Sequence, residues 1–142
     1  MTNFFLDTSV LFKLFVREEL SEQYLSLLKE DPSVHVSHIS WVEFHSALRR
    51  RMDLKELTFA QRNEALQRFK RDWNSYSKIR VEEAVLESAA RLVTAHSLKT
   101  LDSIQLASAL ELSAQLEEPL MFLTADLTLQ AAARREKLRT QI

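Results

Sequence analysis

Short apolar runs alternate along the chain with longer segments in which apolar residues recur every three or four positions. A short apolar run is typical of a buried strand, and the longer periodicity is typical of an amphipathic helix. Apolar runs predict strands at 4–6 and 120–124, and alternation predicts one at 34–37. The segments 77–81 and 138–142 are expected to be further short strands, the last of them at the edge of the sheet. The expected helices are one that begins after Asp7, then 18–29, 40–52, 57–76, 82–96 and 103–115, and one that ends near 136. Strands that are joined by helices throughout predict an α/β domain with a parallel sheet.

Length, charge and cysteine content limit the classes of protein that remain. A chain of 142 residues can bury a sizeable core, and we expect one domain over 1–142. The 19 Lys and Arg residues against 20 Asp and Glu residues leave a net charge of −1, so nucleic-acid binding would need a local basic patch. The absence of cysteine excludes disulfides and thiolate metal sites, and it suits a cytoplasmic location. No apolar run approaches the roughly 20 residues of a membrane span, and no secretion leader is evident.

Glycine is absent from the whole chain. Phosphate-binding loops and the dinucleotide-binding fingerprint need glycine where the backbone approaches a phosphate, so both kinds of site are excluded. An enzyme that binds a flavin, a nicotinamide or a nucleoside triphosphate in these ways is therefore not expected. The helices must also end without the usual glycine cap, for which Asn74 is one candidate.

Four acidic residues occupy equivalent places in the expected topology. Asp7 and Asp126 follow apolar strands, and Glu43 and Asp102 lie at the first turns of helices. Because strand ends and helix starts share one edge of a parallel sheet, the four carboxylates could meet there. Clustered carboxylates repel unless they are protonated or bridged by cations, and oxygen ligands suit Mg²⁺ or Mn²⁺. Such a metal can activate water and stabilise charge on a phosphate.

Each acid also has an ordinary structural explanation. Asp7 and Asp126 could be helix N-caps, and Glu43 could complete a capping box with Ser40. Asp102 could be a first-turn acid that the helix dipole favours. Position alone leaves both interpretations open.

The residues around these acids form four segments in a fixed order. The segments are Phe5–Leu11, Ser40–Leu48, Leu101–Leu110 and Phe122–Asp126. Together they closely resemble the PIN-domain family of metal-dependent ribonucleases, and in particular the VapC-like toxins of type II toxin–antitoxin pairs. The similarity runs from Asn3 to the C-terminus, whereas residues 49–79 carry no matching motif.

The resemblance implies a PIN-like three-layer α/β/α sandwich around a central parallel sheet of about five strands. It implies an endoribonuclease in which one or two Mg²⁺ or Mn²⁺ ions, held by carboxylates, activate water to hydrolyse RNA phosphodiester bonds. The metal ligands and catalytic residues would be Asp7, Glu43, Asp102 and Asp126, steadied by the hydroxyls of Thr8, Ser9 and Thr124. A cognate antitoxin and a homodimer are further expectations of the resemblance. The turn at residues 135–138 lacks the glycine that relatives often have there.

Several basic residues near the acids could contact RNA phosphates. The candidates are Lys13, Arg49, Arg50 and Lys99. The arginines at the end of the 40–52 helix could equally well interact with the helix dipole and solvent, and the lysines could simply neutralise the acidic edge.

Three other functions are open at this point. A PIN nuclease that processes RNA and is not a toxin would carry the same acids. A phosphoryl-accepting receiver domain would need paired acids after the first strand, but Leu6 precedes Asp7. A non-catalytic interaction module could use the apolar and aromatic stripe on the 57–76 helix, although such a stripe more often belongs to the core. The stripe consists of Phe59, Leu66, Phe69, Trp73 and Tyr76.

Overall fold

The computed structural model describes residues 2–141 and has a central sheet of five parallel strands. The strands are β1 (Asn3–Leu6), β2 (Ser33–Ser37), β3 (Ser77–Ile79), β4 (Leu120–Leu123) and β5 (Arg139–Thr140). Their order in the sheet is β3-β2-β1-β4-β5, so β1 lies at the centre and pairs with β2 and β4. All five strands were expected, and the part of the last expected strand at Ile142 lies outside the described residues.

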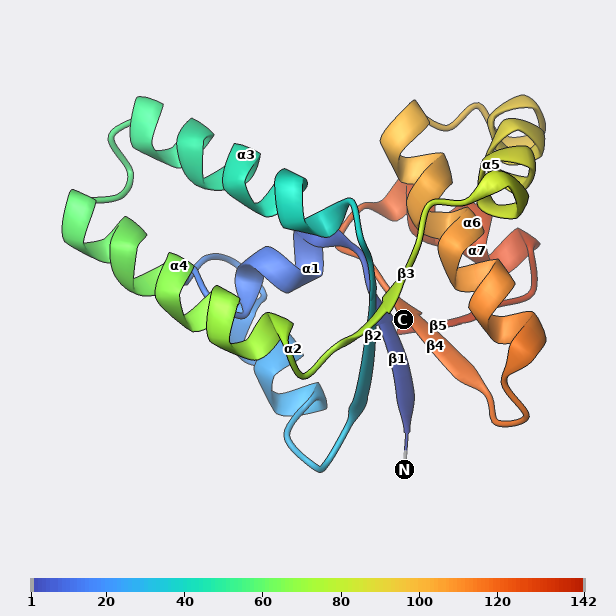
Figure 1. The fold of residues 1–142 in the computed structure, drawn as a ribbon, viewed down its shortest axis with the longest axis horizontal. Coiled ribbons are helices and arrows are strands. Elements are labelled where there is room, and N and C mark those ends of the chain that lie inside the picture. Colours follow the sequence, from blue (N-terminus) through green and yellow to red (C-terminus); the bar gives the residue numbers. More distant parts are fainter. Residues whose placement is uncertain (1, 142) are drawn as a thin grey trace.

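Seven helices within residues 2–141 cover the two faces of the sheet. They are α1 (Thr8–Lys13), α2 (Ser21–Leu27), α3 (Ser40–Asp53), α4 (Phe59–Trp73), α5 (Glu83–His96), α6 (Thr100–Gln115) and α7 (Leu127–Arg135). Helices α1 to α4 lie on one side of the sheet and α5 to α7 on the other (Figure 1). The predicted three-layer α/β/α sandwich is confirmed. No helix in the described part of the chain is long and apolar enough to cross a membrane.

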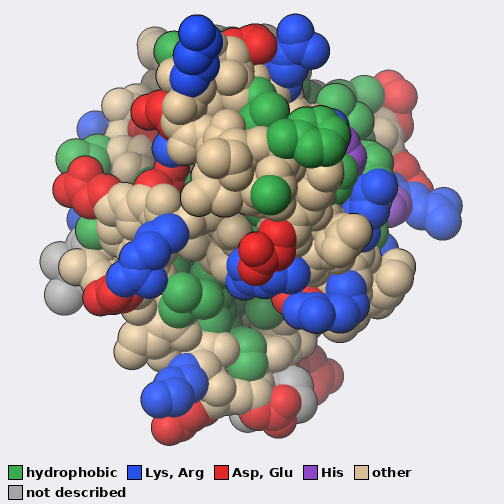
Figure 2. Space-filling view, turned by 90° about the vertical axis from the view of Figure 1, so that its left-hand side faces the viewer, with side chains coloured by type: hydrophobic (Ala, Val, Ile, Leu, Met, Phe, Trp, Pro, Cys, Tyr) green, Lys and Arg blue, Asp and Glu red, His purple; other side chains and the backbone are tan. Residues whose placement is uncertain are grey.

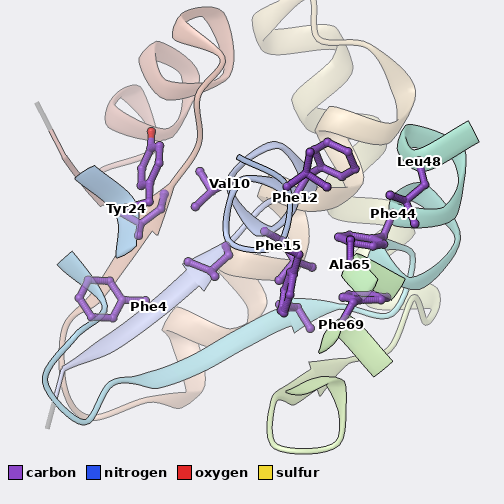
Figure 3. Packing of buried hydrophobic residues seen from close by; sticks show 14 residues of the cluster. Phe4, Val10, Phe12, Phe15, Tyr24, Phe44, Leu48, Ala65 and Phe69 are labelled. Carbon is purple, nitrogen blue, oxygen red and sulfur yellow. The ribbon is translucent and has the colours of Figure 1, made fainter. Parts of the chain in front are cut away.

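Alternation along the strands divides the core into two apolar clusters, one on each face of the sheet. In β1, Phe4 and Leu6 belong to the cluster under α1 to α4, and Phe5 belongs to the cluster under α5 to α7. This is the two-residue period of a strand that is buried on both faces. In the first cluster the rings of Phe44 and Phe69 stack with centroids 3.8 Å apart, next to Phe15 (Figure 3).

The stripe on α4 is mostly part of this core. Phe69 is fully buried, and Leu66, Trp73 and Tyr76 pack against the same cluster. Phe59 is the exception, with 68% of its surface exposed at the start of the helix. The stripe therefore fixes α4 to the sheet and leaves little aromatic surface for a partner.

Some element boundaries and faces differ from those expected. The expected 18–29 helix is shorter in the structure, where α2 spans Ser21–Leu27, and its Leu25 and Leu27 are exposed. The helix begins only at Ser21 because Leu20 before it has a left-handed backbone, with φ of 73°. The Glu18 backbone N–H donates to the Ser21 hydroxyl at this start. In α6, polar Gln105 and Ser108 are buried along with the apolar face, because α6 packs between α5, α7 and the sheet.

Within residues 2–141, five non-glycine residues adopt positive φ angles. They are Leu20, Asp31, Lys55, Ser97 and Lys137. Lys137, with φ of 69°, lies in the glycine-free turn at residues 135–138 between α7 and β5. Asn74 caps the C-terminal end of α4 in a right-handed conformation, so it does not take the place of a glycine.

Candidate active site

The fold brings the four predicted acids to one pocket at the carboxyl edge of the sheet. Asp7 follows β1 and Asp126 lies just beyond β4, and these strands are neighbours. Glu43 and Asp102 lie in the first turns of α3 and α6. All four side chains line a pocket of about 700 Å³. The arrangement follows the rule that sites in parallel sheets form beyond the carboxyl ends of the strands.

Asp7 is the most buried of the four acids, with 4% of its surface exposed. One carboxylate oxygen, Oδ1, accepts hydrogen bonds from the Val10 backbone N–H at 3.1 Å and the Ser9 hydroxyl at 2.6 Å. The other oxygen accepts from the Thr124 hydroxyl at 2.5 Å. Burial is the main cause that raises the pKa of Asp7 to about 6. The three hydrogen bonds oppose this rise, and the nearby charge of Asp102 makes a smaller contribution to it. Asp7 is therefore both the N-cap of α1 and a lining residue of the pocket.

The capping-box interpretation of Glu43 is wrong. The N-cap of α3 is Ile39, which has a right-handed helical backbone, so Ser40 is already inside the helix. Glu43 Oε1 instead accepts hydrogen bonds from Thr8 Oγ1 at 2.6 Å and Gln105 Nε2 at 2.8 Å. The Glu43 carboxylate therefore hydrogen-bonds to residues of α1 and α6 and does not cap the start of α3.

Asp102 and Asp126 complete the acidic group. Burial is the main cause of the raised pKa of Asp102, the charges of Asp126 and Glu43 add to it, and Lys99 opposes it. Asp126 is exposed and caps α7, as expected, by accepting from the backbone N–H groups of Thr128 and Leu129 at 2.8 and 3.0 Å. The carboxylates are thus close enough to influence one another electrostatically.

The three predicted hydroxyl residues all contact acids or the strand that carries them. Thr8 donates to Glu43, and Ser9 and Thr124 donate to Asp7. Ser9 Oγ also accepts from the Ala125 backbone N–H at 3.1 Å, so it joins the ends of β1 and β4. These contacts limit the rotation of Asp7.

Two further polar residues bond to the side chains of the pocket. Gln105 lines the pocket and was not predicted from the sequence, and Ser40 was predicted only as a helix cap. Both are buried, and Gln105 donates to Ser40 Oγ at 3.0 Å as well as to Glu43. A signal for Gln105 existed, because it follows Asp102 by three residues and so lies on the same helix face.

The predicted basic residues lie in different environments. Arg50 lines the pocket beyond Glu43 and donates to Ser46 at 3.1 Å. Arg49 is exposed, pairs with Asp53 at 2.9 Å and is not a lining residue. Lys99 is the N-cap residue of α6, where its charge opposes the rise in the Asp102 pKa.

Lys13 and Arg51 are engaged with Glu18. Lys13 forms a 2.7 Å ion pair with Glu18, and Arg51 pairs with the same carboxylate and lies 5.6 Å from the centroid of the Phe12 ring. Figure 2, which faces the side of α3 and α4, shows basic side chains interspersed with acidic and apolar ones. This face has no continuous basic patch, so an RNA contact there would depend on individual arginines.

The donor set fits a hard divalent cation in its chemistry. None of the four acids forms a salt bridge with Lys or Arg within residues 2–141. Asp7 is buried and Asp102 is half-buried, and neither has a cationic partner in an ion pair. A divalent cation bound by their oxygens would offset the cost of burying these negative charges. No three acidic or histidine side chains in the described chain converge closely enough to form a ready-made metal site.

Solved structures with the same fold include several toxin–antitoxin complexes. A toxin–antitoxin complex from Klebsiella pneumoniae is 23% identical over 86% of this chain and 85% of that chain, with a TM-score of 0.60. VapBC2 from Rickettsia felis, bound to a promoter DNA fragment, is 14% identical over 99% and 98%, with a TM-score of 0.66. VapBC-1 from nontypeable Haemophilus influenzae is 13% identical over 99% and 97%, with a TM-score of 0.63. At these identities the likeness concerns the fold.

Two further comparisons concern the sequence itself. No curated protein matches this chain. The family model described as PIN domain matches residues 4–136, which include all of β1 except Asn3, all of β4 and all four acids. The chain therefore belongs to the PIN-domain family.

Proposed function

We propose that this protein is a Mg²⁺- or Mn²⁺-dependent endoribonuclease and the toxin of a type II toxin–antitoxin pair. The observation that carries the proposal is one pocket lined by four carboxylates, from the ends of β1 and β4 and the first turns of α3 and α6. None of the four pairs with Lys or Arg among the described residues. PIN-domain membership and the fold shared with toxin–antitoxin complexes support it.

The chemistry follows from the positions of the acids. Asp7 would be the most rigid ligand, because Val10, Ser9 and Thr124 hold both of its oxygens. Asp102, Asp126 and Glu43 would complete the ligand set from the surrounding helix starts. A divalent cation bound there would supply Lewis-acid stabilisation of the charge that develops on a phosphodiester. Arg50 would contact a neighbouring phosphate of the RNA.

The same pocket suits a protein partner. It extends from the acids along α3 to Arg50, Arg51 and Leu54, and exposed apolar side chains border it. Val42, Leu54 and Leu101 are between 49% and 68% exposed. We propose that an antitoxin segment with apolar and charged residues occupies this groove and excludes RNA, and that the toxin forms a homodimer.

The central test is RNA cleavage by purified protein with Mn²⁺, with Mn²⁺ and chelator, and with the Asp7→Asn variant. Cleavage is expected only in the first case, because Asn lacks the charge that a cation needs while it can still cap α1. Asp53→Asn is the matched control: Asp53 is an exposed acid on α3 outside the pocket lining, and its variant should cleave at the wild-type rate. Cleavage by Asp7→Asn at the wild-type rate would refute the assignment of this pocket as the nuclease active site.

A further inference from the structure

Gln105 connects three elements beneath the acidic pocket. Its side chain lies in the first half of α6 and is 2% exposed. Its Nε2 lies 2.8 Å from Glu43 Oε1, 3.0 Å from Ser40 Oγ and 3.1 Å from Thr8 Oγ1. The amide therefore joins α6 to the starts of α1 and α3, where the pocket is formed.

The directions of these hydrogen bonds can be worked out from the number of hydrogens. Glu43 can only accept as a carboxylate, so the Thr8 hydroxyl, 2.6 Å away, donates to it. The Thr8 oxygen then accepts from the Ser40 hydroxyl at 2.9 Å, and the two amide hydrogens of Gln105 go to Glu43 and to Ser40. The four side chains form a closed network with Glu43 at its accepting end.

The orientation of the Gln105 amide leaves one of its buried polar atoms without a hydrogen bond, and this indicates what the side chain does. The Gln105 Oε1 atom is buried and has no partner within residues 2–141. Rotating the amide by half a turn would place this oxygen against the Glu43 carboxylate, which repels it. The position thus needs a donor toward Glu43 even though one acceptor of the same side chain stays unsatisfied.

We propose that Gln105 is a positioning residue that holds the Glu43 carboxylate in the geometry needed for divalent-cation binding. The proposal rests on the proposed function, since it assigns Glu43 to the metal site. A hydrogen-bonding partner of a metal ligand typically contributes about 10–100-fold to metal affinity. Gln105 would act only through Glu43 and would not touch the cation or the RNA.

The test measures Mn²⁺ affinity by titration calorimetry for Gln105→Met, Glu43→Gln and the double variant. Gln105→Met keeps the length of the side chain and removes the donor, and we expect at least a tenfold weaker Kd. In the Glu43→Gln background the same substitution should change the Kd by less than about twofold, because the residue it acts through is already altered. Gln115→Met, on the exposed end of the same helix, is the matched control and should bind like the wild type.

The outcomes separate this inference from the proposed function. Equal losses in the wild-type and Glu43→Gln backgrounds, an unchanged Kd for Gln105→Met, or no Mn²⁺ binding by the wild type would each overturn the positioning role. A wild-type protein that binds Mn²⁺ in a Gln105-dependent way but cleaves no RNA would uphold this inference and refute the nuclease. If Gln105→Met does not fold, Gln105→Asn, whose shorter amide cannot reach Glu43, is expected to show the same loss.

Discussion

At the scale of single residues, burial affects Asp7 more than the other acids of the pocket. Its carboxylate closes the first turn of α1 and also lines the pocket, so one side chain serves local structure and the proposed chemistry. The backbone, Ser9 and Thr124 hold it in place, yet burial still raises its pKa to about 6. In the metal-free protein, ionisation of Asp7 therefore lowers the free energy of unfolding.

This cost predicts that Asp7→Asn is more stable than the wild type when no metal is present. The folded protein holds the Asp7 proton more tightly than the unfolded chain does, so wild-type stability falls as pH rises from the ordinary value of 3.8 to about 6. Asn does not ionise, and above that window the variant should gain about 1–3 kcal/mol in its free energy of unfolding.

Urea denaturation of both proteins in chelator, at about pH 4 and about pH 7.5, measures the difference. The gain should be present at the higher pH and small at the lower one. A variant that is less stable than the wild type at both values would show that the hydrogen bonds to Asp7 outweigh its burial.

At the scale of elements, residues at the starts and ends of helices form side-chain hydrogen bonds to other helices that are distant in sequence. The start of α3 needs no side-chain cap, which frees Ser40 and Glu43 to bond α1 and α6. The end of α7 is bonded in a similar way, because Glu136 accepts from Arg91 at 3.0 Å and lies 2.6 Å from His96, both on α5. These contacts join helices that the chain order separates.

The Glu136 contacts predict a stability loss for Glu136→Gln that depends on pH. Hydrogen bonds from Arg91, and then from His96, hold the pKa of Glu136 below its ordinary value of 4.5. A carboxylate whose pKa is lower in the folded protein stabilises the fold at pH values above 4.5. This stabilisation is lost as the pH falls through the pKa of the folded state. Thermal unfolding should show Glu136→Gln less stable than the wild type at neutral pH, with the gap closing in acid. A gap that stays constant down to about pH 3 would contradict the ion-pair explanation.

At the scale of the whole molecule, a nearly neutral chain concentrates negative charge at one edge of its sheet. The sheet order places β1 beside β4, so Asp7 and Asp126 lie at the same edge of the sheet, where α3 and α6 begin. Basic residues are dispersed among acids on the face of α3 and α4 (Figure 2). RNA affinity would then come from a few arginines beside the pocket and from the bound cation.

This distribution predicts different effects for two adjacent arginines. Arg50→Ala should weaken RNA binding and lower the slope of log affinity against log salt by about 0.7, the value for one lost single-strand phosphate contact. Arg49→Ala is the matched control and should change neither quantity, because Arg49 pairs with Asp53 outside the pocket lining. Filter binding with both variants in an Asp7→Asn background measures affinity without cleavage. Equal effects of the two substitutions would refute a specific contact by Arg50.

The sequence by itself determined the order of strands and helices and the places of the four acids. Apolar runs indicate buried strands because both faces of a parallel sheet are covered. The acids could be placed because a position after a strand or in the first turn of a helix is set by neighbouring residues in the sequence. The caps at Asp7 and Asp126 could be predicted for the same reason, because each involves a backbone N–H only two or three positions away.

Only the tertiary structure decided how those residues are used. Thr8 meets Glu43 across 35 positions and Gln105 across 97, and no local pattern records such distances. The same holds for the two exposed leucines of α2, the buried polar face of α6 and the difference between Arg49 and Arg50. Each of these depends on which elements pack together, because packing determines whether a side chain faces solvent, core or pocket.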